Sequence, residues 1–171
     1  MFSKAIIIPT GDELAAGIVL DTDSPAVMGQ LLAVNPSAFV ARTAPVIDKE
    51  ENITNTIKGF AGEGYDLIIL LGGSGGGHRY SSTLGKDYTH TSLDSILEDI
   101  HEGALYGKNG HMWSKLVIGR LGNAVVFNLP GPYEEACATI KAFKESYLKS
   151  EEDLELINKN MLEALKAKYG A

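Results

Sequence analysis

The chain has 171 residues, of which 44% are hydrophobic and 22% charged, so we expect one globular domain over residues 1–171. Its net charge of -7 argues against nucleic-acid and anionic-membrane partners, which require a positive surface. The single cysteine, Cys137, excludes an internal disulfide and a thiolate metal cluster, and no apolar run approaches a membrane span; we expect a cytoplasmic protein.

Strands and helices alternate from the start of the chain. Ala5–Ile8 is a short apolar run that predicts a buried strand, and Thr10–Leu14 predicts a polar turn after it. Ser24 and Pro25 are typical of a helix N-cap and a first helical residue. The apolar spacing that follows predicts a helix over about Pro25–Val34.

A second strand, a second helix and a third strand follow. Phe39–Thr43 predicts a strand, and Ile53, Ile57 and Phe60 mark one face of a helix. The apolar run Asp66–Leu71 is bounded by glycines and predicts a buried strand. This alternation is typical of an α/β fold with a parallel sheet and crossover helices.

The middle of the chain is predicted as helix, loop and hairpin. Apolar residues from Leu93 to Ile100 repeat at helical spacing, with Thr91 as the expected cap. Residues 101–113 are predicted as a loop, and Lys115–Gly119 and Ala124–Leu129 as two strands around a turn.

Two helices are predicted at the end of the chain. Pro130, Gly131 and Pro132 open the first. Residues 150–171 form the second, in which acidic residues at its start favour the positive end of the helix dipole.

The glycine-rich stretch Gly72–Gly77 follows the third strand directly, and five of its six residues are glycine. Without Cβ atoms, its backbone N–H groups can approach a ligand closely at the carboxyl end of the strand, where α/β proteins bind ligands. A flexible linker is the alternative, although linkers seldom follow directly on a buried strand. A dinucleotide fingerprint would need glycine in place of His78, and no P-loop ending is present. The stretch therefore predicts an anion-binding loop of another kind.

Two acidic residues are expected at the same edge of the sheet. Asp48 and Asp87 follow or border predicted strands, and Mg²⁺ prefers one or two carboxylates together with phosphate oxygens. The alternative is that Asp48 caps a helix beginning near Lys49 and that Asp87 is a solvated loop acid. Local sequence leaves both interpretations open.

Four segments of the chain, taken in order, match one pattern. They are Gly11–Leu14 with the following Gly17 and Asp21-Thr22, Asp66–Ile69, Gly72–Gly75 and Asn128–Gly131. Together they resemble the molybdopterin-binding domain family of molybdenum cofactor biosynthesis, the MoaB/Mog-like proteins, over most of residues 4–148. The resemblance implies a three-layer α/β/α fold with a mostly parallel central sheet, its glycine loop at the carboxyl end of a central strand. It also implies a homo-oligomer, trimeric or hexameric.

The resemblance also implies a ligand and an activity. Molybdopterin is the implied ligand or substrate, and the implied enzyme is an adenylyltransferase that activates it with MgATP. Asp48 and Asp87 would be the catalytic residues and would hold the Mg²⁺, the second through the match of Lys86–Thr89 to a family element. The ligand-binding residues would be Thr10, Gly11, Asp12, Gly72, Gly73, Ser74, Gly75, Gly76, Lys86, Pro130 and Gly131.

Two alternatives to the adenylyltransferase stay open. The separation of Gly75 from Asp87 is longer than is usual in the family, which favours a non-catalytic protein that carries the pterin. The competence-damage-inducible nucleotide amidase and pyrophosphatase proteins share a similar domain, although their chains are normally longer.

Overall fold

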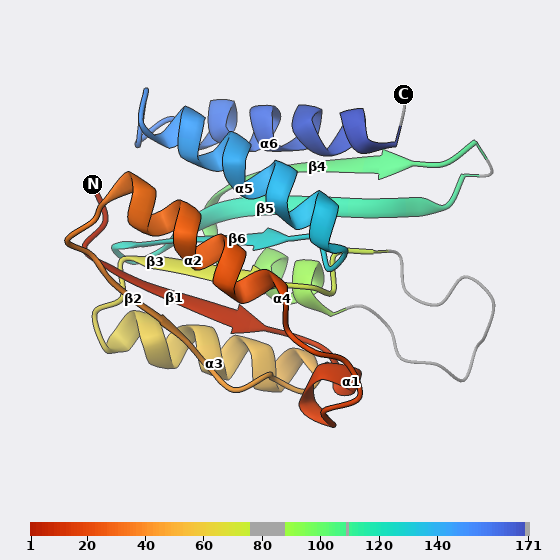
Figure 1. Cartoon of the computed structure of the whole chain (residues 1–171), viewed down its shortest axis with the longest axis horizontal. Helices are drawn as coiled ribbons and strands as arrows, with labels where there is room; N and C mark the ends of the chain where they lie inside the picture. The colour runs from red at the N-terminus through yellow and green to blue at the C-terminus, as the bar shows by residue number, and fades with distance from the viewer. Residues whose placement is uncertain (76–87, 109, 170–171) are drawn as a thin grey trace.

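The computed structural model describes residues 1–75, 88–108 and 110–169. The strands among these residues form one six-stranded sheet (Figure 1) in the order β2-β1-β3-β6-β5-β4. Strands β1, β2, β3 and β6 run parallel, whereas β5 is antiparallel to β6 and to β4. The strands are β1 Lys4–Pro9, β2 Phe39–Arg42, β3 Leu67–Leu71, β4 Glu98–Tyr106, β5 Met112–Leu121 and β6 Ala124–Leu129.

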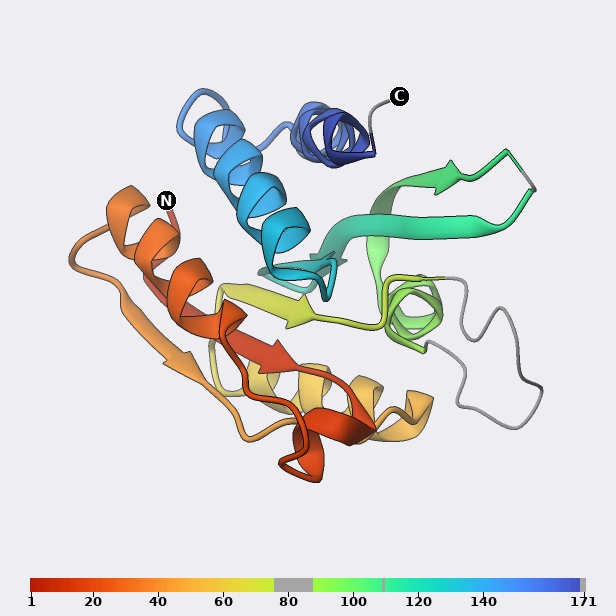
Figure 2. The ribbon, with the colours of Figure 1, turned by 45° about the vertical axis from the view of Figure 1, so that its right-hand side comes forward.

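Helices cover both faces of the sheet. Figure 2 shows α2, α5 and α6 above the sheet and α3 and α4 below it. The predicted fold class, a three-layer α/β/α arrangement with a mostly parallel sheet, is confirmed. The helices are α1 Asp12–Ala15, α2 Asp23–Val34, α3 Glu50–Gly62, α4 Thr89–Ile96, α5 Tyr133–Tyr147 and α6 Leu154–Lys168.

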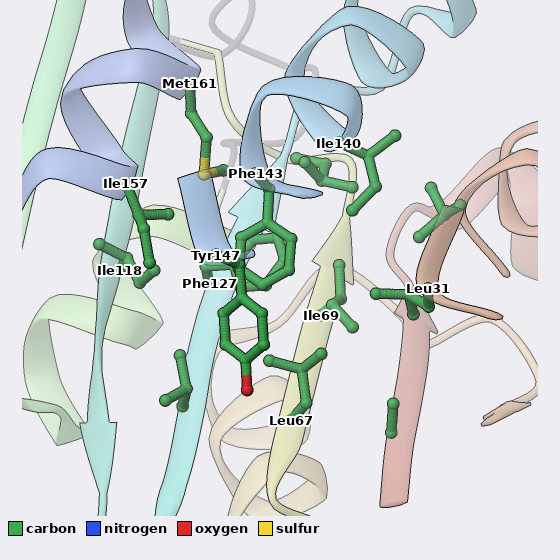
Figure 3. Close-up of a cluster of buried hydrophobic side chains, with 14 of the residues drawn as sticks. Leu31, Leu67, Ile69, Ile118, Phe127, Ile140, Phe143, Tyr147, Ile157 and Met161 are labelled. Atoms are coloured by element: carbon green, nitrogen blue, oxygen red, sulfur yellow. The ribbon is translucent and has the colours of Figure 1, made fainter. Parts of the chain in front are cut away.

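The continuous apolar runs of the central strands are explained by this double covering. Ile7 and Ile69 point into the core under α2, α5 and α6, while Ile6 and Ile68 point into the core over α3 and α4. Alternate residues of a strand face opposite sides of a sheet, so a strand buried on both faces is apolar throughout. The larger core (Figure 3) includes the stacked rings of Phe127 and Phe143, with centroids 4.4 Å apart.

The prediction between residues 89 and 113 was wrong in part. Helix α4 begins at Thr89 after the N-cap residue Tyr88 and ends at Ile96, and residues 98–106 form β4 where a loop was predicted from residue 101. Ile100 therefore lies on a strand. The cause is that β4 is an edge strand rich in polar residues, and its pairing with β5 overrides its low strand propensity.

Smaller differences occur at helix starts. The N-cap residue of α2 is Thr22 rather than Ser24, and the expected polar turn contains one turn of helix, α1. Helix α6 begins at Leu154 rather than at residue 150. Its N-cap residue is Asp153, one of the acidic residues expected at its start, and the Asp153 side chain accepts a hydrogen bond from the Leu156 N–H at 2.9 Å. Within the described ranges, no helix combines the length and apolar character needed to cross a bilayer.

Residues 112–117 of β5 do not pair with β6, and this shapes the end of the sheet. Strand pairing between them covers only Ile118–Leu121 of β5. Before that segment, the buried side chain of Asn128 on β6 bonds the backbone of β5 in place of strand pairing. Its Oδ1 accepts a hydrogen bond from the Val117 N–H at 2.7 Å, and its Nδ2 donates one to the Lys115 carbonyl at 2.9 Å. The N–H of Lys115 donates instead to the carbonyl of Ser74, at 2.7 Å. The glycine loop thus pairs with β5 where β6 no longer does.

Candidate functional site

Three loops meet at the carboxyl ends of the central strands. Pro9, Leu71 and Leu129 lie in register at the ends of β1, β3 and β6. The N–H of Thr10 donates to the Leu71 carbonyl at 2.9 Å, and the N–H of Gly72 donates to the Leu129 carbonyl at 3.1 Å. The structure therefore brings together predicted site residues from three loops: Thr10, Gly11, Asp12, Gly72, Gly73, Ser74, Gly75, Pro130 and Gly131.

Two glycines of this loop are required by its geometry. Gly72 and Gly73 have φ angles of +103° and +62°, which residues with side chains rarely adopt. A Cβ atom on Gly72 would lie 2.8 Å from the Thr10 carbonyl oxygen, and one on Gly73 would lie 2.2 Å from Thr89 Oγ1. The loop can therefore lie directly against β1 and α4 only because these positions have no side chain.

The next two residues of the loop are held by their polar groups. Ser74 is buried, and its Oγ accepts a hydrogen bond from the buried hydroxyl of Ser114 at 3.1 Å. The carbonyl of Gly75 lies 3.2 Å from Nε2 of His90 on α4. The loop is thus fixed on one side by β5 and on the other by α4.

A hollow of ≈ 180 Å³ opens beside the meeting point of these loops. It is smaller than the pockets that enclose a whole drug-sized ligand, so it suits one compact group of a larger molecule. Three predicted residues, Thr10, Gly72 and Gly131, line it. The other lining residues are Leu14, Val19, Leu20, Asp21, Thr22, Asp23, Leu71 and Tyr133.

Two carboxyl groups on the wall of this hollow have unequal acidities. Burial acts to raise the pKa of Asp21, but hydrogen bonds from Ser24 and Arg42 outweigh it and hold that pKa below its usual value. Arg42 Nε lies 2.5 Å from Asp21 Oδ2. Burial, with Asp21 nearby, raises the pKa of Asp23, although the Thr22 hydroxyl donates to it. Such a wall accepts hydrogen bonds from the N–H or O–H groups of a ligand.

Sequence reasoning did not assign Asp21, Asp23 or Tyr133 to a site. The available signal was indirect: Asp21 belongs to one of the four segments that resemble the molybdopterin-binding family. Tyr133 reaches the hollow from the start of α5, and no sequence motif marked it.

Asp48 lies at the same edge of the sheet. The N–H of Gly11 donates to the Val46 carbonyl at 3.1 Å, and the N–H of Asp48 donates to Oδ1 of Asp12 at 3.1 Å. The alternative reading of Asp48 as a helix cap is wrong, because Lys49 is the N-cap residue of α3.

Three predicted site residues, Gly76, Lys86 and Asp87, lie outside the described residues. In residues 1–75, 88–108 and 110–169, no three His, Cys, Asp or Glu side chains form a group that could hold a metal ion. The carboxylates that the structure does place at this edge, Asp12 and Asp48, are hard oxygen donors of the kind Mg²⁺ accepts when a ligand supplies further oxygens.

A larger hollow of ≈ 530 Å³ lies at the opposite edge of the sheet, between α3 and the β5–β6 turn. Lys58, Tyr65, Asp66 and Asn123 are among its lining residues. Ligands of α/β proteins bind at the carboxyl ends of the strands, so the smaller hollow is the candidate site.

Comparison with known proteins gives a consistent result. Residues 6–150 match the family model MoCF_biosynth, described as a probable molybdopterin binding domain. A molybdenum cofactor biosynthesis bifunctional protein of Chlorobaculum tepidum is 30% identical over 130 residues, which are 75% of this chain and 41% of that protein. The chain thus spans less than half the length of this curated relative.

Solved structures share the fold at low sequence identity. The molybdopterin biosynthesis enzyme MoaB of Thermus thermophilus is 21% identical, with a TM-score of 0.61 over 93% of this chain and 98% of that one. The Mog protein of Mycobacterium ulcerans is 19% identical, with a TM-score of 0.59 over 94% and 99%. The protein CinA of Thermoplasma acidophilum, described as of unknown function, is 18% identical, with a TM-score of 0.63 over 85% and 98%.

Proposed function

The chain belongs to the molybdopterin-binding domain family of molybdenum cofactor biosynthesis, and on this premise we propose that it binds molybdopterin at the glycine loop and adenylylates it with MgATP. The observation that carries the proposal is the close approach of the Thr10, Gly72 and Gly131 loops, made possible by glycines at positive φ. A surface of backbone without side chains suits the phosphate groups of both substrates. Such a backbone surface can bind an anion even though the net charge of the chain is -7.

In the proposed reaction, an oxygen of the molybdopterin phosphate forms a bond to the α-phosphorus of ATP, the bond from that phosphorus to the β-phosphate oxygen breaks, and pyrophosphate leaves. Alignment and neutralisation of charge are the main requirements. The glycine loop would align the phosphates, and Asp48 with Asp87 would hold Mg²⁺, with Asp12 beside Asp48. Bound Mg²⁺ would supply positive charge to the phosphate oxygens.

The test is pyrophosphate release from MgATP and molybdopterin, measured together with molybdopterin affinity. For Asp48→Asn we expect release to fall by about 100-fold while affinity stays within a few-fold, because charge stabilisation in the transition state is lost. The control is Glu63→Gln, an exposed carboxylate just after α3, which should change neither quantity. Failure of the wild-type protein to bind molybdopterin would overturn the proposal.

Pyrophosphate release separates the enzyme from a carrier. If the wild-type protein binds molybdopterin but releases no pyrophosphate, and if Asp87→Asn leaves its affinity unchanged, the protein is a pterin carrier. Hydrolysis of ADP-ribose or nicotinamide mononucleotide would instead indicate nucleotide chemistry on the same fold.

A homo-oligomer is the second part of the proposal. Ile18 and Leu20, beside the candidate site, are 76% and 83% exposed, and Ile47 nearby is 49% exposed. Neighbouring exposed apolar side chains of this size are typical of contact surfaces between proteins. Light scattering should give the mass of a trimer or hexamer, and Leu20→Ser should shift it toward the monomer.

A further inference from the structure

We propose that Lys115 is a positioning residue for the glycine loop: it joins β5, α4 and β4 around Ser74 and so holds the loop in its ligand-binding form. The inference deepens the proposed function and rests on it for the identity of the ligand. Lys115 is not among the residues that line the candidate hollow, so it would act through other residues.

The first connection is direct. The backbone N–H of Lys115 donates to the Ser74 carbonyl at 2.7 Å, and the neighbouring Ser114 hydroxyl donates to Ser74 Oγ at 3.1 Å. Ser74 and Ser114 are only 5% and 1% exposed, so water does not compete strongly for these bonds. The position of Ser74 therefore follows the position of this part of β5.

The second connection runs through α4. Lys115 Nζ lies 2.8 Å from Oδ2 of Asp94, five residues along the helix from Thr89. A helix rises about 1.5 Å per residue, so this anchor is roughly 7–8 Å from the end of α4 that contacts the loop. At that end Thr89 packs against Gly73, and His90 lies beside the Gly75 carbonyl.

The third connection reaches the edge strand. Lys115 Nζ lies 2.7 Å from Oε2 of Glu102 on β4, which pairs with β5 at the edge of the described sheet. One ammonium thus links β4 to α4 through two carboxylates that come from different elements. Without it, the Asp94 and Glu102 carboxylates would face each other across the same space and repel.

The environment of Lys115 favours the charged form of its side chain. Its side chain is only 17% exposed. Burial acts to lower the pKa of the Lys115 ammonium, but hydrogen bonds and charge from Asp94 and Glu102 more than offset burial and raise it above its usual value. The group is therefore charged at neutral pH.

Hydrogen exchange measured by mass spectrometry tests the proposal directly. In Lys115→Met we expect exchange in segments 72–75 and 89–96 to accelerate about tenfold or more, because these segments open locally when the link is lost. Exchange in the central strands 4–9 and 124–129 should not change. Lys115→Arg should restore wild-type exchange, and Lys141→Met, on an exposed lysine of α5, is the control that should have no effect.

Molybdopterin titration is the second measurement. Lys115→Met should weaken binding about tenfold or more, since small displacements of positioning groups have large effects, and Lys115→Arg should restore it. Exchange in Lys115→Met that equals that of the wild type in both segments would overturn the positioning role. If the wild-type protein does not bind molybdopterin but the exchange results hold, only the proposed function fails.

A gentler variant covers the case in which Lys115→Met does not fold. Asp94→Asn keeps Lys115 and its contact with Glu102 and weakens only the connection to α4. It should accelerate exchange in segment 89–96 more than in segment 4–9. Equal exchange rates in wild type and Asp94→Asn at segment 89–96 would contradict the proposal.

Discussion

The hydroxyl oxygen of Thr10, at the end of β1, lies 3.0 Å from the hydroxyl oxygen of Thr89, at the start of α4. Both residues are buried, and the Thr10 hydroxyl also lies within hydrogen-bond distance of the Leu71 carbonyl, at 3.3 Å. This pair connects two ends of the candidate site that are 79 residues apart in sequence.

A double-mutant cycle measures this contact. Thr10→Val and Thr89→Val should each lower the free energy of unfolding by about 1 kcal/mol, because each leaves a buried hydroxyl with one partner fewer. The two losses should be less than additive by about 0.5–1 kcal/mol in urea unfolding, since the residues are in contact. Strict additivity would show that the two hydroxyls do not interact.

Gly73→Ala should lower the free energy of unfolding more than an alanine substitution at another glycine with positive φ. A φ of +62° costs alanine about 1–2 kcal/mol, and contact between the new Cβ and Thr89 Oγ1, at 2.2 Å, adds to it. Gly122→Ala is the matched control, because Gly122 has a φ of +57° and nothing within 4 Å of a Cβ. Equal losses of unfolding free energy in the two variants would show that α4 moves aside without cost.

Asn128→Leu should destabilise the protein by about 2–4 kcal/mol, because it leaves the Val117 N–H and the Lys115 carbonyl without their partner in a buried place. The measurement is urea unfolding. Asn55→Ala, on the exposed side of α3, is the control and should change stability by less than about 0.5 kcal/mol. A decrease in the free energy of unfolding smaller than the contribution of one hydrogen bond would mean that β5 pairs with β6 in the variant.

The carboxylate of Asp21 should stabilise the protein in a pH-dependent way. Burial opposes its ionisation, but hydrogen bonds from Ser24 and Arg42 hold its pKa below its usual value. A lowered pKa in the folded state means that the stabilisation is complete above the unfolded value and is lost as the pH falls through the folded value.

We therefore expect Asp21→Asn to cost about 1–2 kcal/mol at pH 7 and progressively less below pH 4, as measured by urea unfolding at several pH values. Glu145→Gln, at an exposed position of α5, should show little change at any pH. A difference between wild type and Asp21→Asn that stays constant down to pH 2 would contradict this account.

Much of the fold could be predicted from local patterns. The runs Ala5–Ile8 and Asp66–Leu71 are too short and too apolar for anything but strands buried on both faces. The glycines directly after the second run indicated where to expect the candidate site. Strand β4 could not be predicted in this way. Its residues have little strand propensity of their own, and they are extended because β5 pairs with them.

The sequence by itself determined the doubly covered sheet and the places where the chain needs glycine, because burial on two faces and positive φ impose requirements on single residues. Only the tertiary structure decided which groups meet at the glycine loop: Thr89 against Gly73, Asp21 and Asp23 on the wall of the hollow, and Lys115 between Asp94 and Glu102. These contacts join residues far apart in the chain. Their geometry depends on how β5 leaves β6 and how the helices pack, which no local pattern contains.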